Sequence, residues 1–60
     1  MEFYLIDDDR NVLNVLKRII MDRELGTVCG CAQNGRDAMD DFEEKSPDIV
    51  IVDLLMPEMD

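Results

Sequence analysis

The sequence predicts an α/β fold: a three-layer βαβαβ fragment of a doubly wound parallel sheet, with the strands in the order 2-1-3. Residues 3–6 and 49–52 are apolar runs with the length and residue types of strands that are buried on both faces. Between them, two stretches of helical periodicity flank a third strand-like run at 27–32. Such alternation with short connections is typical of parallel strands joined by right-handed helical crossovers.

The first strand, at residues 2–6, leads through three aspartates into the first helix. Asp9 can cap this helix, because its side-chain oxygen can accept hydrogen bonds from backbone N–H groups two or three residues on. Apolar residues then recur at helical spacing and predict the buried stripe. They are Val12, Leu13, Leu16, Ile19 and Ile20, with Val15 widening the stripe. We expect the helix to end near residues 24–26, with Gly26 as the stop.

The second half of the chain repeats the pattern. Residues 27–32 form a weaker strand, because Gly30 interrupts its interior. Asn34 can cap a second helix over residues 36–45. Its inner stripe is predicted to contain Ala38, Met39 and Phe42. The last strand is residues 49–52.

The charge and length of the chain limit its function. It has 60 residues and a net charge of −9, which argues against direct contact with nucleic acid or with an anionic membrane. No apolar stretch approaches membrane-spanning length and the N-terminus has no basic signal region, so a cytoplasmic location is expected. Because the sequence stops after a strand and a loop, we expect the front part of a longer fold.

Acidic residues follow two strands that are predicted to be neighbours. Asp7, Asp8 and Asp9 come directly after the first strand, and Asp53 comes directly after the last. The carboxyl ends of parallel strands meet at one edge of the sheet, where doubly wound folds bind ligands. Oxygen ligands without histidine select a hard cation such as Mg²⁺. Asp53 is then the candidate nucleophile for a phosphoryl group, whereas Asp9 fits a helix cap better than a ligand.

At this point the sequence resembles the receiver domain of two-component response regulators, which has a flavodoxin-like fold. The matching features are the strand followed by Asp7-Asp8, the turn at Asn34-Gly35, and residues 47–57 with a Met-Pro pair after Asp53. They cover the whole chain in the family's order and spacing.

The resemblance implies a role for each acidic residue. Asp53 would be the phosphoacceptor and would take a phosphoryl group from a sensor histidine kinase. Asp7 and Asp8 would hold Mg²⁺ together with Asp53, and Leu55 would supply a backbone carbonyl to the metal. The chain would be a phosphoacceptor rather than an enzyme, with at most self-phosphorylation and self-dephosphorylation in the full-length protein. A DNA-binding output that regulates transcription is the commonest companion in the family.

Receiver domains also contain parts that this sequence lacks. Similar domains have five strands and five helices, with a Ser or Thr and a Lys on the last two strands. Residues 1–60 therefore correspond to the N-terminal part of a receiver domain, without its last two strands and last three helices. The alternative function is an inactive half-domain. It would self-associate as a homodimer or a domain-swapped assembly through the uncovered edge of the strand at 49–52.

Other site chemistries fit less well. Haloacid-dehalogenase-type phosphatases place a second Asp two residues after the nucleophile, where this chain has Leu55. An EF-hand loop is excluded because Val12 and Arg18 stand where its glycine and glutamate are needed. Cys29 and Cys31 should point to the same face of a strand. We interpret them as two reduced, partly buried thiols rather than as a metal or redox pair.

Overall fold

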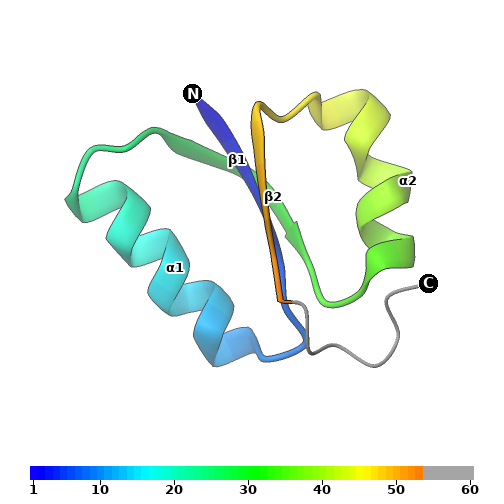
Figure 1. Ribbon diagram of the computed structural model, residues 1–60, viewed down its shortest axis with the longest axis horizontal. Coiled ribbons are helices and arrows are strands. Elements are labelled where there is room, and N and C mark those ends of the chain that lie inside the picture. The colour runs from blue at the N-terminus through cyan, green and yellow to red at the C-terminus, as the bar shows by residue number, and fades with distance from the viewer. Residues whose placement is uncertain (54–60) are drawn as a thin grey trace.

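The computed structural model describes residues 1–53 and contains the five elements that the sequence predicts (Figure 1). In chain order they are β1 (Glu2–Ile6), α1 (Arg10–Asp22), β2 (Thr27–Ala32), α2 (Gly35–Lys45) and β3 (Ile49–Val52). No helix within this described part is long and apolar enough to cross a membrane.

The three strands form one parallel sheet in the order β2-β1-β3, which confirms the predicted topology. Alternate residues of β1 face opposite sides of the sheet. Phe3 and Leu5 pack against α1, whereas Tyr4 and Ile6 pack on the side of Ala38 from α2. The sheet therefore lies between the two helices as the middle of three layers (Figure 1). The predicted fold class is confirmed.

β2 contains a β-bulge that was not predicted from the sequence. Phe3 pairs with Val28 and Tyr4 pairs with Gly30, so Cys29 is the extra residue. Because a bulge shifts the alternation of side chains, Cys29 packs on the α2 side of the sheet and Cys31 on the α1 side. The prediction that both thiols share a face was therefore wrong. Both are free and partly buried, as expected.

Gly30 within β2 and Gly26 just before it both lie too close to β1 or to Met1 for a larger residue to fit. A Cβ atom at Gly30 would lie 2.8 Å from the ring of Tyr4, and one at Gly26 would lie 2.3 Å from the backbone oxygen of Met1. Gly26 thus lies directly before β2 and does not terminate α1. The helix already ends at Asp22, and the left-handed residue after it is Glu24, with φ of 52°.

Part of the predicted apolar core is exposed. Leu13 and Ile20 of α1 are buried and Leu16 is partly buried, but the outer flank of the same stripe faces solvent. These exposed residues are Val12, Val15 and Ile19. Met39 is 68% exposed, so its predicted core position was wrong.

β3 also differs from the expectation of a strand buried on both faces. Ile49 and Val50 are exposed, and Ile51 and Val52 are only partly buried. The physical reason is the position of the helices, because α1 packs on β1 and β2, and α2 packs on β2. The outer edge of the sheet at β3 thereby has little cover within residues 1–53.

Candidate functional site

Backbone hydrogen bonds continue both strand pairings one residue beyond the strands, and this places two of the aspartates. The Asp7 N–H donates to the Ala32 carbonyl at 3.1 Å, and the Asp53 N–H donates to the Ile6 carbonyl at 3.0 Å. Asp7 and Asp53 are therefore fixed side by side at the carboxyl ends of β1 and β3. This is the edge at which the sequence predicts the site.

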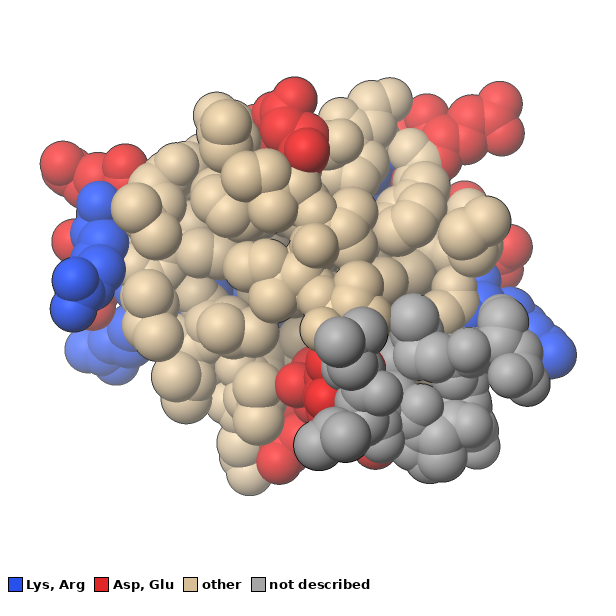
Figure 2. Space-filling view, viewed as in Figure 1, with Lys and Arg blue, Asp and Glu red and all other residues tan. Residues whose placement is uncertain are grey.

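The side chains of three aspartates converge at this edge. One carboxylate oxygen from each of Asp7, Asp8 and Asp53 lies within 4.8 Å of the other two. The exposure of the three residues differs, because Asp7 is buried, Asp53 is intermediate and Asp8 is exposed. Figure 2 shows acidic side chains reaching the surface at the lower edge, where β1 and β3 end in Figure 1.

Local hydrogen bonds separate the roles of Asp7 and Asp9. The Asp9 N–H donates to Asp7 Oδ1 at 2.9 Å, which fixes the orientation of the buried carboxylate. Asp9 Oδ1 in turn accepts a hydrogen bond of 2.8 Å from the Asn11 N–H and caps α1. The predicted capping role of Asp9 is confirmed, and the predicted group of close carboxylates consists of Asp7, Asp8 and Asp53.

Gln33 is a neighbour of the site that was not singled out from the sequence. Its Nε2 donates to the backbone carbonyl of Asp8 at 3.2 Å. The available signal was its position, because Gln33 directly follows β2 and so lies at the same edge as the ends of β1 and β3. Leu55, the predicted source of a backbone carbonyl ligand, lies outside the described residues.

The donor set of this cluster suits a hard divalent cation. All three side chains offer carboxylate oxygens, which Mg²⁺ and Ca²⁺ prefer to nitrogen or sulfur ligands. A cation would also offset the repulsion between three negative charges at short range. The residues present therefore fit Mg²⁺, with Asp7, Asp8 and Asp53 as the side chains that would hold it.

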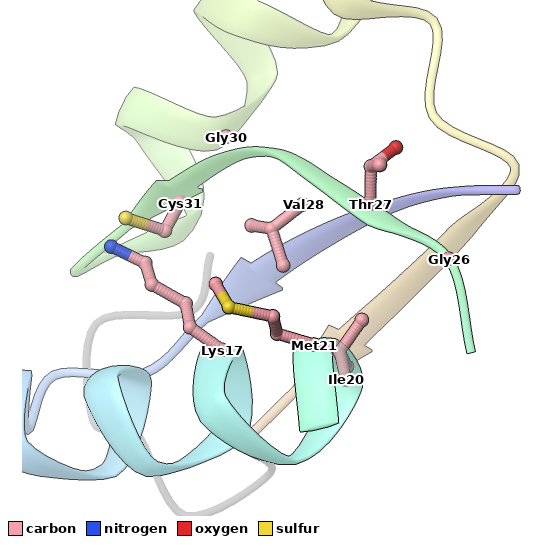
Figure 3. Close-up of a pocket in the computed structure, with 8 residues that line it drawn as sticks. All are labelled: Lys17, Ile20, Met21, Gly26, Thr27, Val28, Gly30 and Cys31. Carbon is pink, nitrogen blue, oxygen red and sulfur yellow. The ribbon is translucent and has the colours of Figure 1, made fainter. Parts of the chain in front are cut away.

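A separate groove lies between α1 and β2, and it has a different chemistry (Figure 3). Its cavity volume is about 480 Å³. Figure 3 shows the Lys17 amine directed toward the Cys31 thiol at one end of the groove. The apolar lining is provided by Ile20, Met21 and Val28. None of the three clustered aspartates lines this groove, so the two features are distinct.

A parallel α/β sheet with three carboxylates beyond the ends of neighbouring strands defines a doubly wound domain with a candidate cation site. A family model described as the response regulator receiver domain matches residues 3–60. The chain therefore belongs to the response regulator receiver domain family, and the resemblance found in the sequence is confirmed.

Two curated relatives are similar over the whole chain. The transcriptional regulatory protein GlnL of Bacillus subtilis (strain 168) is 41% identical over 61 residues, which is 100% of this chain and 19% of GlnL. The chemotaxis protein CheY of Listeria monocytogenes is 35% identical over 60 residues, which is 100% of this chain and 50% of CheY. The chain thus spans about half the length of one relative and about a fifth of the other. No solved structure gives a significant match.

Proposed function

We propose that Asp53 accepts a phosphoryl group from a phosphohistidine of a sensor histidine kinase, and that Asp7 and Asp8 hold Mg²⁺ beside it. The observation that carries this proposal is the convergence of three carboxylates from two neighbouring strand ends, with oxygens within 4.8 Å of one another. Membership in the receiver family supports it.

The transfer is a displacement at phosphorus. A carboxylate oxygen of Asp53 forms the new P–O bond while the P–N bond to the histidine breaks, and the imidazole nitrogen keeps the electron pair. Bound Mg²⁺ supplies positive charge that offsets the negative charges of the phosphoryl group and the carboxylates. The Asp7 carboxylate is already held in one orientation, because Asp7 is buried and its carboxylate accepts a hydrogen bond from the Asp9 N–H. Asp53 is partly exposed, so an incoming donor can reach it.

In this role the chain is a phosphoacceptor rather than an enzyme acting on a separate substrate. A full-length receiver domain that contains these residues would at most promote its own phosphorylation and dephosphorylation. The proposed location of this reaction is the cytoplasm. Where a DNA-binding output is attached, phosphorylation of Asp53 would regulate transcription, and residues 1–60 would make no contact with the nucleic acid themselves.

The test is phosphorylation of the protein by acetyl phosphate with Mg²⁺, followed by intact-mass spectrometry. The native protein should gain one phosphoryl group, and Asp53→Asn should gain none. Asp48→Asn is a matched control, because Asp48 lies at the opposite end of β3 and its Oδ2 accepts the Glu2 N–H at 2.7 Å. A gain that persists in Asp53→Asn would remove Asp53 from this role.

A second candidate function is self-association, and the exposed edge of β3 favours it. Ile49 and Val50 are 36% and 40% exposed, and β3 carries no charged residue that would discourage pairing with another strand. Two copies would pair or exchange elements through β3 to form a homodimer. In this reading the chain is an inactive half-domain.

A further inference from the structure

The side chain of Gln33 connects the end of β2 to the loop that carries Asp8. Its Nε2 donates a hydrogen bond of 3.2 Å to the Asp8 carbonyl oxygen. We infer that Gln33 is a positioning residue for the cation site, which orients Asp8 so that the site favours Mg²⁺ over larger divalent cations. This inference rests on the proposed function, because it assumes that Asp7, Asp8 and Asp53 hold Mg²⁺.

Gln33 can act as a positioning residue because its own backbone is held on both sides. On one side Ala32 is buried at the end of β2 and accepts the Asp7 N–H at 3.1 Å. On the other side Asn34 caps α2 and accepts the Asp37 N–H at 2.8 Å. The amide of Gln33 therefore reaches toward Asp8 from a fixed point at the sheet edge.

Asp8 needs such support more than its neighbours do. Asp7 is buried and bonded to β2, and Asp9 is fixed by its cap on α1, whereas Asp8 is exposed and is not oriented by packing. The planar peptide unit between Asp8 and Asp9 is held at both ends, because Gln33 Nε2 donates to its carbonyl and its N–H donates to Asp7 Oδ1, and the two bonds together restrict ψ of Asp8. That restriction sets the direction of the Asp8 Cα–Cβ bond, from which the carboxylate reaches the cation site.

The choice of cation depends on this orientation. Mg²⁺ demands near-ideal octahedral geometry at short distances, whereas Ca²⁺ accepts longer and more variable arrangements. A loosened Asp8 would therefore weaken Mg²⁺ binding more than Ca²⁺ binding. A merely structural role of Gln33 would instead affect both ions equally or neither.

The test is isothermal titration of the protein with MgCl₂ and, separately, with CaCl₂. Gln33→Met keeps the length of the side chain but removes the donor, and the exposed position tolerates this change. We expect the Kd for Mg²⁺ to rise about tenfold, with the Kd for Ca²⁺ changed less than about twofold. Thr27→Val is the matched control, because it removes a hydrogen bond of 2.6 Å to Glu2 at the other end of the same strand. It should leave both Kd values unchanged.

The outcomes separate this inference from the proposed function. An unchanged Kd for Mg²⁺ in Gln33→Met, or an equal loss for both ions, overturns the positioning role. If Asp8→Asn still loses Mg²⁺ binding in that case, the proposed cation site stands and only the role of Gln33 fails. If the native protein binds no Mg²⁺, both are overturned.

Discussion

Tyr4 ties the centre of the sheet to α2 through a single buried hydroxyl group. Its ring is fully buried and meets Phe42 edge-on, with ring centroids 5.1 Å apart. The hydroxyl donates a hydrogen bond of 2.7 Å to Asp41 Oδ2. Burial of the phenol, and then the hydrogen bond and the negative charge of Asp41, raise the pKa of Tyr4 above its ordinary value.

The raised pKa of Tyr4 predicts a loss of stability in alkali. Above about pH 10 the phenol of the unfolded chain loses its proton while the folded chain keeps it, so the free energy of unfolding falls as the pH rises. Below that pH, Tyr4 makes its full contribution to the free energy of unfolding. Tyr4→Phe should cost about 1–2 kcal/mol at neutral pH, because it removes the hydrogen bond to Asp41, and should flatten the alkaline decline.

Urea unfolding followed by circular dichroism at a series of pH values from neutral into alkali measures both effects. Because the two proteins differ only in the phenol hydroxyl group, the difference between their curves reports on Tyr4. Parallel curves for native protein and Tyr4→Phe would contradict the raised pKa.

At the scale of the element, the end of α1 contains a backbone conformation that its residue does not favour. The Leu25 N–H donates to the Ile20 carbonyl at 3.0 Å and the Glu24 N–H donates to the Met21 carbonyl at 3.1 Å, which is the Schellman pattern. Glu24 occupies the left-handed position with φ of 52°, where glycine is usual. Glu24→Gly should therefore raise the free energy of unfolding by about 1 kcal/mol, as measured by thermal unfolding.

Gly26→Ala is the opposing control for this change, because its new Cβ would lie 2.3 Å from the Met1 oxygen. Like Glu24→Gly, it replaces a single residue of the connection between α1 and β2, but it should destabilise the protein. A loss of stability in Glu24→Gly would show that the side chain of Glu24 contributes more than its backbone conformation costs.

The elements also show what the sequence could predict. Asp9 and Asn34 cap their helices as expected, because capping depends on residues that are neighbours in the chain. The bulge at Cys29 depends on how Gly30 packs against the ring of Tyr4, which is a contact between strands. Gly30 was the available signal, since a glycine inside a strand often marks a bulge. Periodicity predicts a stripe on α2, but the exposure of Met39 depends on where α2 packs, which is on β2 at one end of the strand order.

The same distinction applies to the candidate site. The carboxylates of Asp7, Asp8 and Asp53 could be predicted to converge because strand order and strand ends alone bring them together. The contact between Gln33 and Asp8 could not, because it depends on the rotamer of one long side chain in a loop. Geometry set by the sheet is therefore accessible from sequence, whereas geometry set by loops is not.

At the scale of the whole molecule, the described chain has an uneven distribution of apolar surface. β1 is buried on both faces, while β3 forms an edge whose outward side carries few charged side chains (Figure 2). On the α1 side of the sheet, the exposed flank of α1 at Val12, Val15 and Ile19 adds to this apolar surface. An uncharged edge strand with exposed apolar neighbours is a template for pairing with another strand.

We therefore predict that the 60-residue chain forms dimers through β3, and that a charge on this edge separates them. Val50→Lys should shift the chain to monomer, because pairing would bury the ammonium group beside apolar side chains. Thr27→Lys is the matched control, since it places the same charge on the opposite edge strand β2 at an exposed position. Sedimentation velocity at micromolar concentration measures the result.

The net charge of −9 opposes association of two copies, so added salt should increase the dimer fraction by screening this repulsion. A native chain that sediments as a monomer at every salt concentration would exclude β3 as a self-association edge.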